Sequence, residues 1–86
     1  MTSVHIYSDT SDRAVFNYEF EDYFTSQEGE EFNFDENYYS RLPERYKRNF
    51  DKHNLKIGKY LVHDAYEDDS VSLGKISYIF IKPVKE

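Results

Sequence analysis

Three histidines, His5, His53 and His63, are the side chains of this chain that titrate near neutral pH and so suit acid–base or metal chemistry. His63 precedes Asp64 in a segment with strand character, where adjacent side chains point to opposite faces of a sheet. We therefore do not expect this pair to hold one metal ion. The chain has no cysteine, which excludes disulfides, thiolate metal sites and thiol catalysis. The sequence predicts no cofactor and no metal.

The carboxylates near the third histidine form an acidic run at residues 64–69. This run lacks the ligand spacing and the glycine of a calcium loop. The chain also lacks a glycine-rich phosphate loop, a nucleophile elbow and a HExxH motif. These observations favour a binding protein over an enzyme.

The formal net charge of −6 hides a strong segregation of charge along the chain. Residues 1–40 carry a net charge of −9, and the eight acids within residues 14–40 have no lysine or arginine among them. Residues 41–62 carry +5, and residues 63–86 carry −2. A chain with an acidic balance is a poor candidate for direct binding to nucleic acid or to an anionic membrane.

The alternating pattern of residues 14–24 places Glu19 and Glu21 on one face of a predicted strand, about 6.8 Å apart. If residues 31–35 pair back as a hairpin, a second acidic row lies beside them. That row would consist of Glu31, Asn33 and Asp35. In size, charge and composition, such a surface resembles what DNA-mimic inhibitors present to a nucleic-acid-binding groove. The resemblance implies a phage-type inhibitor of a host defence or DNA-processing enzyme.

The first hypothesis is therefore a small acidic inhibitor that docks on a basic protein, such as a nucleic-acid-binding protein or a nuclease. The candidate partner-binding residues are the acids and tyrosines of the acidic part of the chain: Glu19, Glu21, Asp22, Tyr23, Glu28, Glu30, Glu31, Asp35, Glu36, Tyr38 and Tyr39. The alternatives are an immunity, antitoxin or adaptor-type module that uses tyrosine and phenylalanine as anchors, or a self-associating domain, for example a homodimer.

A basic stripe follows the acidic part, because Arg41, Arg45, Arg48 and Lys52 are spaced by four, three and four residues. Three interpretations remain open for it. The stripe belongs to an ordinary amphipathic surface helix, it contacts nucleic acid, or it meets a partner with acidic groups, including a second copy of the chain.

The elements that must position these residues follow from the periodicity of the apolar residues. We expect strands at residues 4–8, 14–24, 31–35, 57–66 and 71–84, turns at 9–12 and 67–70, and one main helix within 37–54. Ser40 is a candidate helix cap, and Pro43 is acceptable only in the first turn of a helix. Apolar residues on both faces of the last strand predict a central, well-covered position in the sheet.

The chain of 86 residues suits a single small domain, with 19% aromatic residues to build its core. We expect an α+β fold, in which an antiparallel sheet of four to five strands, in the order β-β-β-α-β-β, packs on one main helix. Since no signal-peptide pattern or apolar run of membrane-spanning length occurs, we expect a cytoplasmic location, in the host cytoplasm if the protein is phage-encoded.

Overall fold

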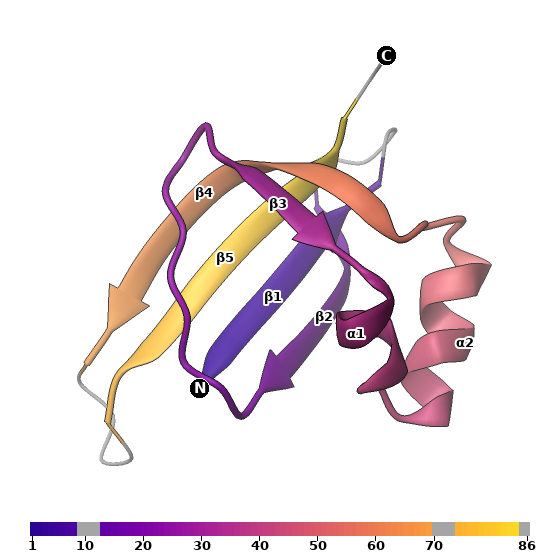
Figure 1. The fold of residues 1–86 in the computed structure, drawn as a ribbon, viewed down its shortest axis with the longest axis horizontal. Helices are drawn as coiled ribbons and strands as arrows, with labels where there is room; N and C mark the ends of the chain where they lie inside the picture. Colours follow the sequence, from indigo (N-terminus) through magenta and orange to yellow (C-terminus); the bar gives the residue numbers. More distant parts are fainter. Residues whose placement is uncertain (9–12, 70–73, 85–86) are drawn as a thin grey trace.

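The computed structural model describes residues 1–8, 13–69 and 74–84, which form one five-stranded sheet and two helices (Figure 1). The strands are β1 (Thr2–Tyr7), β2 (Ala14–Phe20), β3 (Glu31–Phe34), β4 (Gly58–Asp68) and β5 (Ile76–Pro83). The helices α1 (Glu36–Ser40) and α2 (Glu44–Lys52) lie between β3 and β4 in the chain. The α+β class predicted from the sequence is confirmed. The predicted turn at residues 9–12 lies outside the described residues. So do residues 70–73, which include the end of the predicted turn at 67–70 and the start of the predicted last strand.

The sheet is mixed and not antiparallel throughout, which corrects the prediction. Its strand order is β2-β1-β5-β4-β3, and β5 pairs parallel with β1 while the other three pairings are antiparallel. The last strand occupies the centre because it is apolar on both faces, with Ile79 and Ile81 fully buried on one side. Insertion of β5 next to the first strand makes one pairing parallel.

The acidic hairpin predicted from residues 14–24 and 31–35 does not form. Strand β2 pairs with β1 at one edge of the sheet, and β3 pairs with β4 at the opposite edge. Two acidic strand faces side by side would repel each other. The observed pairing separates them and still directs Phe16 and Phe20 of β2, and Phe32 and Phe34 of β3, into the core.

An aromatic core joins the two edges of the curled sheet. The rings of Phe20 from β2 and Phe34 from β3 approach to 6.4 Å between centroids. The ring of Phe50 from α2 stacks on Phe34 at 5.4 Å and meets Phe16 edge-on at 5.6 Å. Such offset and edge-on aromatic pairs stabilise beyond their buried area. The abundance of phenylalanine therefore compensates for the small number of aliphatic residues in a chain of this size.

Residues 21–30, which we call the strap, connect β2 to β3 and cross the same side of the sheet as the helices (Figure 1). The buried Thr2 hydroxyl accepts a hydrogen bond from the Phe24 backbone N–H at 2.9 Å and donates one to the Asp22 carbonyl at 2.8 Å. At the other end of the strap, Gly29 and Val62 are joined by a backbone hydrogen bond of 2.9 Å. The strap is therefore attached at both ends.

The helical region contains two helices where the sequence predicted one. Pro43 separates them, because it lies in extended geometry at the N-cap position of α2. The predicted cap at Ser40 is wrong: Asp35 caps α1 by accepting a hydrogen bond from the Tyr38 N–H, while the Ser40 hydroxyl donates to the Asn37 carbonyl. Neither helix of the described residues has the length and apolar character that a membrane crossing requires.

Candidate binding surface

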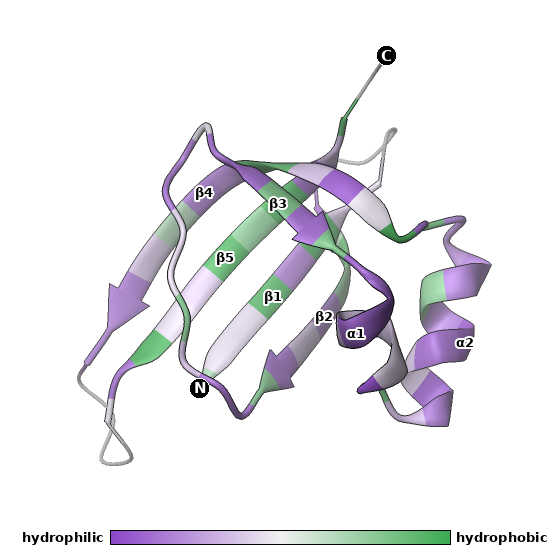
Figure 2. Cartoon of the chain, in the orientation of Figure 1, coloured by the Kyte–Doolittle hydropathy of each residue, from purple (hydrophilic) through white to green (hydrophobic). Residues whose placement is uncertain are grey.

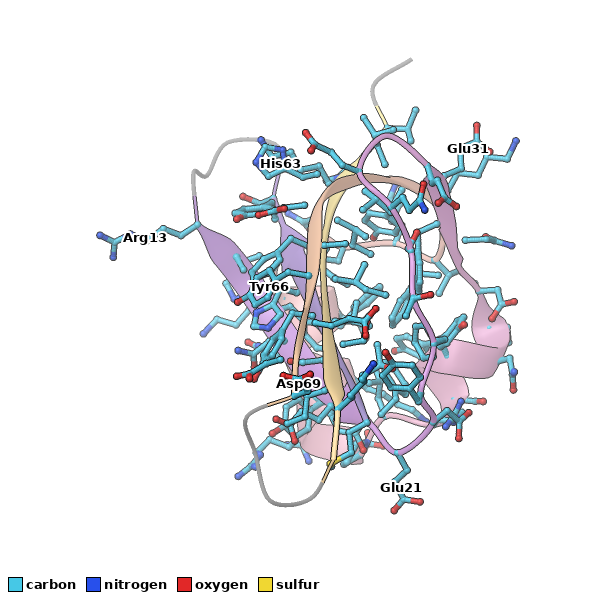
Figure 3. All side chains as sticks on the ribbon, turned by 90° about the vertical axis from the view of Figure 1, so that its left-hand side faces the viewer. Arg13, Glu21, Glu31, His63, Tyr66 and Asp69 are labelled. Atoms are coloured by element: carbon cyan, nitrogen blue, oxygen red, sulfur yellow. The ribbon has the colours of Figure 1, made fainter. Side chains whose placement is uncertain are left out.

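One side of the sheet is covered by the helices and the strap, and the other side, which we call the outer face, is not. In Figure 3, the labelled Tyr66 and His63 lie on the opposite side of β4 from the helices. The strand registers place the following residues on the outer face: Ser3, His5, Tyr7, Asn17, Glu19, Asp64, Tyr66, Tyr78, Phe80 and Lys82. Aromatic side chains therefore form the centre of a face that no described element covers.

The rings of Tyr66, Tyr78, Phe80 and His5 form an aromatic stack that crosses from β4 over β5 to β1. Tyr66 stacks on Tyr78, with centroids 4.9 Å apart and an interplanar angle of 19°. His5 stacks on Phe80 at 4.5 Å and 20°. The Tyr66 and Phe80 rings lie 5.9 Å apart and are also nearly parallel, at 22°. Tyr66 is at one end of the stack, and about half of this residue is exposed to solvent, at 51%.

A second aromatic contact lies beside the stack, where the Tyr7 ring meets His63 edge-on at 5.5 Å. The register of β4 against β5 shifts between Val62 and Asp64, which makes His63 a bulge residue. This bulge places both His63 and Asp64 on the outer face, whereas the sequence predicted opposite faces. The Lys82 ammonium lies 5.3 Å from the centroid of the Tyr7 ring, so this end of the face carries a base.

His5 is the residue of the stack whose ordinary pKa lies near neutral pH. Burial lowers its pKa, and the charge of Glu19 opposes this effect. Its Nε2 atom lies 3.0 Å from the Ser3 hydroxyl, but Ser3 is only 5% exposed, so the hydroxyl satisfies the histidine and does not face a substrate. A shallow hollow of about 400 Å³ opens beside this pair. Its lining residues include Asn17, Glu19 and Tyr78.

Carboxylates surround the exposed end of the stack. Asp64 and Asp68 occupy the outer face of β4 on either side of Tyr66, because they pair with Phe80 and Ile76. The sequence placed Asp68 in a turn, but β4 continues to this residue. On the other side of the strand, Glu67 accepts a 2.5 Å hydrogen bond from the Tyr23 hydroxyl. This bond is the largest cause of the raised pKa of Tyr23.

The predicted acidic residues are spread over the molecule. Glu19 lies on the outer face of β2, and Glu31 lies on the solvent side of β3 at the opposite edge of the sheet. The exposed acids between or after these strands are Glu21, Glu28, Glu30 and Glu36. Asp22 forms a 3.0 Å ion pair with Arg41, and Asp35 is the helix cap described above. The two acidic rows expected from the sequence are not brought together.

The tyrosines predicted as partner anchors have different surroundings. Tyr38 packs on the core, with its ring 5.4 Å from that of Phe20 and 5.6 Å from that of Phe34. Tyr39 packs edge-on against Phe50 at 5.3 Å and donates a hydrogen bond to Asp51. Tyr23 is 46% exposed. The first two rings therefore help to hold the helices, and the third is available at the surface.

Three of the four residues of the basic stripe lie on α2, on the covered side of the sheet. Arg45, Arg48 and Lys52 line an open hollow of about 540 Å³ together with Tyr46 and Asn49. The fourth member, Arg41, precedes the helix and is held by Asp22. Three members of the stripe therefore share one surface of α2, and the fourth is separated from them by its ion pair with the strap.

Within residues 1–8, 13–69 and 74–84, no three side chains of His, Cys, Asp or Glu approach closely enough to hold a metal ion. Comparisons with protein-family models, with curated proteins and with solved structures find no match to this chain. The outer face is therefore interpreted from its own chemistry.

The sequence interpretation did not single out Tyr66, which is exposed, or Tyr78 and Phe80, which are partly buried beside it. It correctly predicted that Ile76, Tyr78 and Phe80 share one face of the last strand and that Ile79 and Ile81 share the other. What the sequence interpretation did not take into account is the size of the chain. Two short helices and the strap cover only one face of the five-stranded sheet. A strand that is apolar on both sides in so small a chain indicates an exposed aromatic face.

Proposed function

We propose that this protein is a binding protein that docks on a basic surface of another protein through its outer face. The observation that supports this most directly is the aromatic stack of Tyr66, Tyr78, Phe80 and His5 on a sheet face that no described element covers. Exposed apolar groups gathered in one patch are typical of interaction sites. Tyrosine is also one of the residues that contribute most to binding energy at protein interfaces.

The carboxylates around the stack select the charge of the partner. Asp64 and Asp68 lie next to Tyr66 on β4, and Glu19 lines the hollow beside Tyr78. An arginine or lysine of a partner would find a ring face for a cation–π contact and a carboxylate within reach of the same ring. The net charge of −6 would steer such a partner toward the protein over a longer range.

The effect of docking on a nucleic-acid-binding partner would be inhibition. A basic surface that is occupied by this protein is no longer accessible to phosphate groups. This function requires only occlusion and does not depend on two parallel rows of carboxylates. Of the candidate residues of the acidic part, Glu19 then lies on the outer face and Tyr23 contacts Glu67 on the other side of β4. The exposed acids elsewhere contribute to steering.

The test is capture of the partner with tagged protein, followed by affinity measurements on the purified pair. We expect Tyr66→Ala to weaken binding about tenfold or more, and the combination of Asp64→Asn with Asp68→Asn to weaken binding and reduce its salt dependence. Matched controls are Arg48→Ala on α2 and Glu28→Gln in the strap, which change exposed residues away from the outer face. Binding that persists in the outer-face variants but fails in the controls would show that the docking surface lies elsewhere.

A further inference from the structure

Half of β4 has an unpaired edge. β4 is 11 residues long, but β3 pairs only with Gly58–Leu61, and the backbone bonds of Val62 to the strap extend this pairing by one residue. On its other side, β4 pairs with β5 as far as Asp68. From His63 to Glu67, no other described strand pairs with the side of β4 that faces away from β5. Figure 1 shows this end of β4 as the outermost strand on its side of the sheet.

The backbone groups that face this edge can be assigned from one hydrogen bond. The Ala65 N–H donates to the Asp64 carboxylate at 2.9 Å, and therefore points away from β5. Because backbone groups alternate in direction along a strand, the N–H and carbonyl of Glu67 point to the same open side. Ala65 and Glu67 thus offer donors and acceptors to an additional strand, and the Asp64 side chain covers the first of these donors while the edge is free.

The charge of this edge distinguishes between possible occupants. Residues 63–69 contain four acids, Asp64, Glu67, Asp68 and Asp69, and neither lysine nor arginine. Figure 2 shows the same end of β4 as strongly hydrophilic. Charged side chains on an edge strand oppose pairing with an identical strand, because like charges would then face each other. An extended segment that carries lysine or arginine is attracted instead.

The side chains of an added strand would alternate between two environments. Those opposite Tyr66 would lie on the outer face, where Asp64 offers a carboxylate and Tyr66 an exposed ring. Those opposite Ala65 and Glu67 would lie on the covered side of the sheet, where an apolar side chain can pack beside Ala65 at the margin of the core. The pattern that fits is basic at every second position and apolar in between.

We propose that an extended segment of the basic partner, with lysine or arginine at alternate positions, adds as a sixth strand to the edge of β4 at residues 63–67. This inference rests on the proposed function, since it specifies how the basic partner is held. Strand addition supplies affinity through backbone hydrogen bonds and specificity through the alternate side chains.

The test uses an alternating Lys–Val octapeptide and two N-methylated forms of it. In the proposed antiparallel addition, a residue opposite Ala65 or Glu67 directs both of its backbone groups to β4. The valine N–H groups then point to β4 and the lysine N–H groups point away. N-methylation of the valines is therefore expected to weaken binding about tenfold or more, since it removes backbone hydrogen bonds. N-methylation of the lysines is expected to leave binding nearly unchanged. In the complex, the Ala65 and Glu67 amides should exchange with solvent more slowly.

Each alternative outcome is informative. If both methylated peptides bind like the parent peptide, and the Tyr66→Ala protein still binds all three less well, strand addition is wrong and docking of cations on the outer face stands. If the parent peptide does not bind at its highest soluble concentration, strand addition is also overturned. The proposed function is judged separately, by the outer-face variants and the captured partner.

Discussion

The Tyr66 ring stacks on the Tyr78 ring with centroids 4.9 Å apart, yet about half of the Tyr66 side chain remains exposed. One face of Tyr66 is therefore held by a neighbouring strand, while the rest of the ring is open to solvent. A ring fixed in this way loses little side-chain entropy when a partner covers it. The stack thus presents a preorganised aromatic surface.

We predict that Tyr66→Ala lowers stability only modestly, because the half-exposed ring loses its contacts with Tyr78 and Phe80 but little buried area. The expected loss in the free energy of unfolding is about 1–2 kcal/mol, since each aromatic pair contributes about 0.5–1.5 kcal/mol. Urea denaturation followed by circular dichroism measures it. A fully unfolded variant would contradict a binding role for this ring and assign it to the core.

Tyr38→Ala is expected to be far more damaging, with a loss of about 2–4 kcal/mol, because the ring packs on Phe20 and Phe34 in the core. Tyr23→Ala is the matched tyrosine control and should cost less than about 1 kcal/mol, since Tyr23 is exposed. Thermal unfolding of the two variants under the same conditions compares them. Equal melting temperatures would show that Tyr38 is a surface residue, as the sequence interpretation assumed.

The assignment of Asp35, and not Ser40, as the N-cap of α1 can be tested directly. Asp35→Ala should lower the free energy of unfolding by about 1 kcal/mol, because the Tyr38 N–H loses its acceptor. Ser40→Ala should change it by less than about 0.5 kcal/mol, since the Ser40 hydroxyl is exposed and caps no helix start. The reverse order of effects in urea denaturation would support the cap predicted from the sequence.

His5 predicts a pH dependence of stability. Burial lowers its pKa in the folded protein below the ordinary value of about 6.5, so the unfolded chain binds more protons between these two pKa values. Stability should therefore rise with pH through this window and level off above about pH 6.5. His5→Gln keeps a polar partner for Ser3 and should show a smaller slope from pH 5 to 6.5 in urea denaturation. An unchanged slope would mean that other groups cause the dependence.

Several elements of the fold can be predicted from the sequence, because the spacing of apolar and polar residues in this chain is regular over short segments. The alternation of Phe16, Tyr18 and Phe20 with polar residues correctly identified the core face of β2, and Pro43 marked the start of the second helix. The burial of Ile79 and Ile81 also follows from the apolar character of the last strand. These features depend on side-chain period and backbone geometry, which short segments determine by themselves.

Strand pairing could not be obtained in the same way. A hairpin between residues 14–24 and 31–35 was the simplest local pairing, but β2 and β3 end at opposite edges of the sheet. Pairing brings together segments distant in sequence, and its free energy depends on which arrangement buries the aromatic side chains of the whole chain at once. For the same reason, Asp35 was predicted in an acidic row of a hairpin, whereas in the structure it follows β3 and caps α1.

The sequence by itself determined the class of fold, the separation of acidic from basic segments and the unusual weight of aromatic residues. Only the tertiary structure decided which of those residues meet. Insertion of β5 between β1 and β4 brings Tyr66 next to Tyr78 and places Phe80 next to His5. The physical reason is that two short helices and a strap can cover one face of a five-stranded sheet, so the aromatic residues of the other face remain at the surface.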